Sequence, residues 1–131
     1  MTLLKPRMML AISSRSPNAK HLIDCTADLA GKLKAEWFVV HVEQPPSLHY
    51  GWPATFHPVP EADLAHAEKR GARVFVEHGD VTKALVAFAR TMSISYFVTG
   101  RSHRPRISFT WRLPLTEQIQ RKLPGAVVVI V

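Results

Sequence analysis

Five short apolar blocks divide this chain, and each is separated from the next by a longer stretch of mixed polarity. The blocks are rich in β-branched and aromatic residues, and most run without alternation between polar and apolar positions. This pattern is typical of parallel strands that are buried on both faces of a sheet. It predicts a layered α/β fold in which helices cover both faces. The blocks lie at residues 8–12, 37–42, 73–77, 94–99 and 126–131.

Amphipathic helices are predicted between the blocks. The first two are expected at residues 17–34 and 61–69, and the third is expected to begin after Asp80. The fourth is expected to begin at Pro114 and to end at Pro124 and Gly125. Ser16 is expected to cap the first helix, with Pro17 at its first position, and Asp80 is expected to cap the third.

The alternation of strands and helices predicts one domain, residues 1–131, with a five-stranded parallel sheet. Right-handed crossovers favour the strand order 3-2-1-4-5, in which the first and fourth strands are neighbours. The loops that follow these two strands then meet in a crevice at the carboxyl edge of the sheet. Residues 44–60 hold five prolines and are expected to form a loop or lid, because proline at this density excludes a continuous helix.

Basic charge is concentrated in the last third of the chain. Residues 1–82 carry nine Lys and Arg against nine Asp and Glu, whereas residues 83–131 carry eight basic residues and one acid, Glu117. Glycine and arginine directly after the fourth strand indicate an anion site at the crevice. The candidate ligand-binding residues are Ser13, Ser14, Arg15, Ser16, Gly100, Arg101, Ser102, His103 and Arg104, and the candidate partner-binding residues are Arg106, Trp111 and Arg112.

Other classes of function have little support in the sequence. We expect no enzyme, because no nucleophile–base–acid set or carboxylate pair is recognisable, and no metal site, because the seven histidines lack ligand spacing. Nucleic-acid binding is an alternative at pI 10.1, although aromatic residues do not interleave with the arginines. One cysteine and the absence of a long apolar run predict a cytoplasmic protein without membrane insertion.

Two stretches carry a resemblance to a known family. One runs from Met9 through the serines of residues 13–16 to Glu43, and the other runs from Gly79 to Ser102 and on to the last strand. Over roughly two-thirds of the chain the sequence resembles a universal stress protein domain. It is most similar to the domain of KdpD-type potassium-responsive sensor histidine kinases. The resemblance implies the adenine nucleotide alpha hydrolase-like fold.

Universal stress proteins that bind ATP carry an Asp after strand 1 and the pattern G-x2-G-x9-G-S/T after strand 4. Here Ser13 stands at the Asp position, Gly100 keeps the first glycine, and His103 replaces the second. Leu113 and Pro114 stand where the last two residues of the pattern would be. We therefore do not expect ATP as a ligand, and an ATP-binding protein with a degenerate site is kept as an alternative.

The sensor-kinase branch replaces the glycines with a basic loop, as this chain does after Gly100. Some members bind cyclic di-adenylate through a Ser-x-Ser and an aromatic-led segment of strand 2 that ends in Tyr. Ser14 and Ser16 match the first motif, while Trp37 leads the second and His41 replaces its Tyr. The resemblance implies a non-catalytic regulatory module that binds an anionic ligand, a nucleotide or cyclic dinucleotide included, or an acidic partner or sensor kinase. It also implies a homodimer through the last strand.

Overall fold

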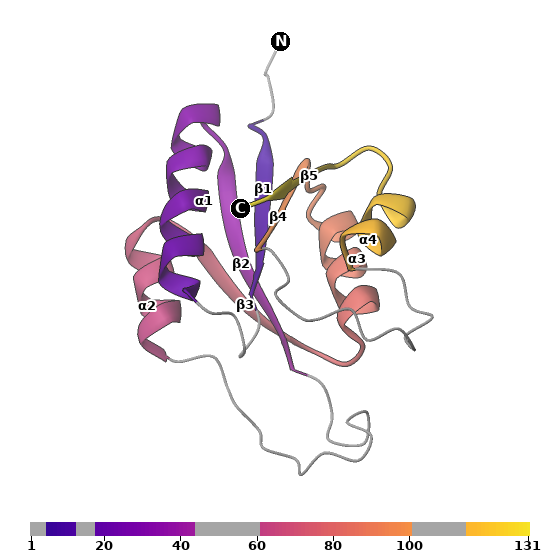
Figure 1. Cartoon of the computed structure of the whole chain (residues 1–131), viewed down its shortest axis with the longest axis horizontal. Coiled ribbons are helices and arrows are strands. Elements are labelled where there is room, and N and C mark those ends of the chain that lie inside the picture. The colour runs from indigo at the N-terminus through magenta and orange to yellow at the C-terminus, as the bar shows by residue number, and fades with distance from the viewer. Residues whose placement is uncertain (1–4, 13–17, 44–60, 101–114) are drawn as a thin grey trace.

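The computed structural model describes residues 5–12, 18–43, 61–100 and 115–131, which form a parallel sheet flanked by helices (Figure 1). The strands are β1 (Arg7–Ile12), β2 (Glu36–Glu43), β3 (Arg73–His78), β4 (Tyr96–Thr99) and β5 (Val127–Ile130). The helices are α1 (Ala19–Leu33), α2 (Glu61–Lys69), α3 (Val81–Thr91) and α4 (Leu115–Lys122). The expected loop or lid at residues 44–60 lies outside the described residues.

The sheet has the order β3-β2-β1-β4-β5, and every neighbouring pair is parallel. This confirms both the predicted fold class and the predicted strand order. Leu10, in the central strand β1, is the register partner of Val39 in β2 and of Val98 in β4. All three are fully buried on one face, and their neighbours Met9, Phe38 and Phe97, which belong to the core on the other face, are buried as well. The middle of the sheet is therefore covered on both sides.

Two apolar cores lie between the sheet and the helices that cover its two faces. On one face, Leu22 and Ile23 of α1 and Ala67 of α2 pack against Leu10 and Val39. The other core joins α3 and α4 to the opposite face of the same strands, through Met9, Phe38, Val40, Leu85, Val86, Phe88, Ala89, Phe97 and Ile119. Successive strand residues point to opposite faces, so each short apolar strand supplies both cores at once.

The helix starts agree with the sequence expectation in one case and differ in another. The Asp80 carboxylate accepts a hydrogen bond from the backbone N–H of Lys83 at 3.0 Å, so Asp80 is the predicted N-cap of α3. The prediction for α1 was wrong, because its N-cap is Asn18 rather than Ser16 and the helix begins at Ala19. Asn18 has φ 61°, a left-handed conformation that does not belong to a right-handed helix and that Asn tolerates well.

None of the helices in the described part of the chain combines the length and the hydropathy that crossing a bilayer requires.

Candidate functional site

The central strands β1 and β4 end side by side at the carboxyl edge of the sheet. Ala11 and Thr99 are register partners, so the chain leaves both strands within one or two residues of this pair (Figure 1). This adjacency was predicted, and it places the start of both candidate loops at one edge. Gly100 is the candidate ligand-binding residue that the structure describes. Ser13, Ser14, Arg15, Ser16, Arg101, Ser102, His103, Arg104, Arg106, Trp111 and Arg112 lie outside the described residues.

Gly100 touches helix α1. A Cβ atom built on Gly100 would lie 3.0 Å from Leu22 Cδ1 and 3.2 Å from Leu22 Cδ2, which is closer than side chains normally pack. Leu22 is 8% exposed and belongs to the core between the sheet and α1. The sequence explained this glycine by the approach of a ligand to the backbone. The structure adds a packing reason, because a larger residue would require the Leu22 side chain to shift by a few tenths of an ångström.

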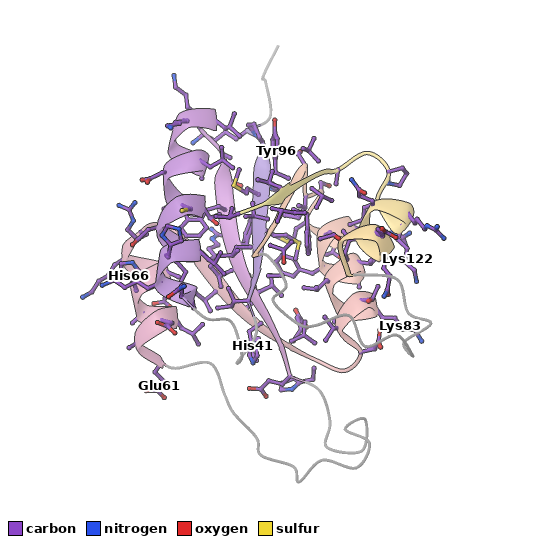
Figure 2. The ribbon with its side chains drawn as sticks, viewed as in Figure 1. His41, Glu61, His66, Lys83, Tyr96 and Lys122 are labelled. Carbon is purple, nitrogen blue, oxygen red and sulfur yellow. The ribbon has the colours of Figure 1, made fainter. Side chains whose placement is uncertain are left out.

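His41 of β2 is a buried polar residue at the same edge (Figure 2). Its side chain is 5% exposed, and its Nδ1 lies 3.2 Å from the carbonyl oxygen of Ile12, the last residue of β1. Ile12 and His41 are also register partners. The ring therefore ties the end of β1 to β2 at the point where the serine segment of residues 13–16 begins.

The sequence interpretation treated His41 as the loss of a tyrosine and did not list it as a site residue. The available signal was an imidazole within a strand whose other central positions are apolar. A buried polar group is costly without a hydrogen-bond partner, so a histidine at such a position indicates a specific contact.

The last residues of β2 and β3 are also in contact at this edge. Glu43, the last residue of β2, has Oε2 3.5 Å from Nδ1 of His78, the last residue of β3. The backbone carbonyl of Glu43 accepts a hydrogen bond from the N–H of Gly79 at 3.0 Å, and Gly79 has φ +118°. This left-handed turn, which glycine adopts without strain, carries the chain from β3 into α3.

The described residues contain no group of three or more His, Cys, Asp or Glu side chains placed to hold a metal ion. Cys25 in α1 lies beside His21, with Sγ 3.5 Å from Nε2. Among the described residues, no further polar side chain is found in contact with this pair to complete a catalytic set. Within the described residues, His41, Glu43 and His78 supply the polar side-chain contacts noted at the carboxyl edge.

Comparison with known proteins establishes the fold of this chain and nothing further. No family model matches the chain, and no curated protein matches it by sequence. Among solved structures, a universal stress protein in complex with cAMP aligns with TM-score 0.65 and 16% identity, over 95% of each chain. The fold is that of the universal stress proteins.

Two further universal stress proteins support this assignment of the fold. UspA from Lactobacillus plantarum aligns with TM-score 0.64 and 14% identity over 99% of each chain. A universal stress protein from Archaeoglobus fulgidus in complex with dAMP aligns with TM-score 0.58 and 16% identity over 98% of each chain. At such identities the likeness establishes architecture alone, and the similarity to the sensor-kinase branch stays a prediction.

Proposed function

We propose that this protein is a non-catalytic regulatory module that binds a nucleoside monophosphate at the carboxyl edge between β1 and β4. The observation that carries the proposal is the pairing of Ala11 with Thr99, which brings the two strand ends together. A serine segment follows one end and an arginine-rich segment follows the other. Hydroxyl, backbone N–H and guanidinium groups are the donors that proteins use for phosphate.

Two universal stress proteins of this fold supply the chemical class of the ligand. One was solved with cAMP and the other with dAMP, and both ligands combine adenine with a single phosphate. In this chain, His103 and Leu113 stand at the later glycine positions of the ATP motif, and Pro114 stands at its Ser/Thr position. Side chains at the two glycine positions hinder the close approach of phosphates to the backbone, and Pro114 offers neither a hydroxyl nor an N–H. A single phosphate therefore fits the sequence better than a triphosphate.

The test compares the binding of AMP, cyclic AMP, cyclic di-adenylate, ATP and inorganic phosphate by calorimetry and thermal unfolding. A ligand at a hundred times its Kd adds about 2.7 kcal/mol to the free energy of unfolding, so binding is readily seen. We expect AMP or cyclic AMP to bind more tightly than ATP. The double variant Arg101→Ala, Arg104→Ala should lose this binding and stay folded.

The matched control is Arg121→Ala, Lys122→Ala, which removes the same charge from exposed positions on α4. It should retain nucleotide binding. Equal binding by the unchanged protein and the Arg101/Arg104 variant would contradict a phosphate site at the arginine segment. Failure of every nucleotide to bind would contradict the proposed function as a whole.

A second candidate is docking of an acidic protein, such as a sensor kinase of the KdpD type. The described cations of the last third of the chain lie on α3 and α4, where Lys83, Arg90, Arg121 and Lys122 are all exposed. Figure 2 shows Lys83 and Lys122 on the same side of the molecule. This candidate predicts binding of poly-glutamate that weakens with salt and with the Arg121→Ala, Lys122→Ala variant. Nucleotide binding without poly-glutamate binding would exclude it.

A further inference from the structure

Helix α2 is too short to be stable without the rest of the fold. It holds nine residues, Glu61–Lys69, and isolated helices shorter than about 12–15 residues are marginal in water. Its stability depends on contacts with α1 and β3, on the face of the sheet opposite to α3 and α4 (Figure 1). Separation of α2 from these two elements would therefore also melt the helix.

The apolar part of these contacts is small. Ala67 is the one fully buried residue of α2 and brings a single methyl group to the core, against which Leu64 is partly buried. The other short helix, α4, buries the larger side chain of Ile119. Helix α3 buries four side chains, those of Leu85, Val86, Phe88 and Ala89. Because stabilisation grows with the apolar surface that is buried, apolar contacts hold α2 less firmly than α3 or α4.

Three polar contacts join α2 and the residue after it to α1. Nε2 of His66 lies 2.7 Å from Oδ1 of Asp24 (Figure 2). Nε of Arg70 lies 3.4 Å from the same oxygen, and its Nη2 donates a hydrogen bond to Asp28 at 2.9 Å. The side chains of Asp24, Arg70 and Asp28 are 41%, 40% and 70% exposed. Ion pairs with this exposure stabilise weakly, so they favour the docked position of α2 by a small margin.

The connection from α2 to β3 can act as a hinge. Gly71 is exposed and has φ +94°, a conformation that glycine adopts without strain. The next residue, Ala72, is buried in the core, and its N–H donates to the carbonyl of Ala67 at 3.0 Å. Rotation at Gly71 would release α2 and leave Ala72 in place. It would uncover the face of β3 on which Val74 packs against the core and Val76 is 42% exposed.

We propose that α2 is a conformational device of this fold, which unfolds and refolds locally as one unit while β3 and α3 keep their structure. The contacts of Asp24 and Asp28 with His66 and Arg70 set how often α2 opens. In the open form, the outer strand β3 presents an apolar face that α2 otherwise covers. The proposal is independent of nucleotide binding, since these residues do not belong to the candidate site.

Native-state hydrogen exchange of the unchanged protein tests the proposal without any variant. The amides that are hydrogen-bonded within α2, together with the N–H of Ala72, should share one protection factor. This factor should depend only weakly on urea, because little surface is exposed when α2 opens. The amides of residues 85–89 in α3 should be at least about a hundredfold better protected, with the stronger urea dependence of global unfolding. Equal protection of α2 and α3 would overturn the proposal.

A variant tests whether the polar contacts control the opening. Asp24→Asn removes the charge that His66 and Arg70 contact, so it should lower the protection of the α2 amides about fivefold. The matched control is Glu68→Gln, an exposed position on α2 for which the described contacts include no ion pair, and it should leave protection unchanged. Fraying that leaves the contacts with α1 in place does not respond to Asp24→Asn. Unchanged protection in this variant would therefore show that α2 does not open as a unit.

Discussion

Gly100 shows how one atom sets the distance between a helix and a sheet. The missing Cβ leaves room for the end of the Leu22 side chain, which would otherwise lie 3.0 Å away. Because α1 follows β1 in the chain, this contact also joins the end of β4 to the helix that comes after β1. The same residue thus serves packing and places the start of the arginine segment.

We expect Gly100→Ala to lower the free energy of unfolding by about 1–3 kcal/mol, since Leu22 must move within a filled core. Gly31→Ala is a matched control, because a Cβ at Gly31 meets no atom within 4 Å and the position lies in the last turn of α1. It should leave stability unchanged or raise it by about 0.5–1 kcal/mol. Denaturant unfolding measures both, and equal stability of the two variants would contradict the packing role.

At the level of single residues, the sequence predicted a contact correctly where the contact joins near neighbours in the chain. Asp80 caps α3 through a bond to the N–H three residues ahead, a contact that the sequence alone specifies. Ser16 was as good a candidate for α1, but the left-handed backbone of Asn18 decides where that helix begins. His41 was not listed as a site residue because its partner, Ile12, lies 29 positions away and is reached only once the strands pair.

At the scale of elements, α2 contacts α1 through polar side chains as well as through a small apolar surface. Ala67 is its one fully buried residue, so the apolar contact is small. Asp24 of α1 accepts a hydrogen bond from Nε2 of His66 at 2.7 Å. Arg70, just after α2, reaches Asp28 at 2.9 Å and Asp24 at 3.4 Å. The contacts of His66 with Asp24 and of Arg70 with Asp28 each span 42 positions. They cannot be read from the sequence because they depend on how the two helices pack.

The hydrogen bond from His66 is the main reason that the pKa of Asp24 lies below its ordinary value of 3.8, and the charges of His66, Arg70 and Lys20 act in the same direction. Partial burial opposes them. A lowered carboxyl pKa stabilises the fold at pH values above the unfolded-state pKa. That contribution is lost as the pH falls through the folded-state pKa.

Asp24→Asn should therefore destabilise the protein most above about pH 5, and its difference from the unchanged protein should shrink below about pH 4. Unfolding by urea across this range measures the effect. Glu68→Gln is the matched control, because Glu68 is an exposed carboxylate on α2 for which the described contacts include no ion pair. A pH-independent difference for Asp24→Asn would show that the carboxylate charge does not hold α2.

For the whole molecule, the edge strands of the sheet are β3 and β5. At one edge, β5 exposes Val127 and Ile130 by 53% and 54% of their surface. An apolar strand with an open edge pairs readily with a second strand. We expect a homodimer through β5 that Val127→Lys abolishes in sedimentation experiments.

Val76 on β3, at the opposite edge, is 42% exposed and provides the control substitution Val76→Lys, which should leave the dimer intact. A monomer at every concentration would refute the dimer. Loss of the dimer in both variants would show that the edge was wrongly assigned.

The basic character of the whole chain leads to another prediction. The formal net charge is +7. The described cations of the basic region lie on two helices, α3 and α4. We expect duplex DNA to bind no more tightly than about 1 µM at physiological salt, with the steep salt dependence of non-specific contacts. Fluorescence anisotropy over a salt series measures this, and nanomolar binding that persists in salt would favour the nucleic-acid alternative.

The sequence was sufficient for the architecture and insufficient for the site. Short apolar blocks such as residues 37–42 specify strands buried on both faces, and crossover handedness then leaves few orders for five strands. Contacts such as His41 with Ile12, or Gly100 with Leu22, join residues from different elements and appear only after assembly. The loops that carry most candidate ligand residues follow no periodic pattern, so the sequence gives their chemistry and not their shape.

The central place of β1 has a consequence for synthesis of the chain. Arg7 at the start of β1 donates a hydrogen bond to the carbonyl of Met92, 85 positions later, and β4 follows directly after. At translation rates of roughly 5–20 residues per second, β4 is synthesised on the order of ten seconds after β1. During this time the edge of β1 that pairs with β4 has no partner strand. Nascent protein is therefore vulnerable to aggregation until β4 emerges, and chaperones that cover extended apolar segments should bind it during that interval.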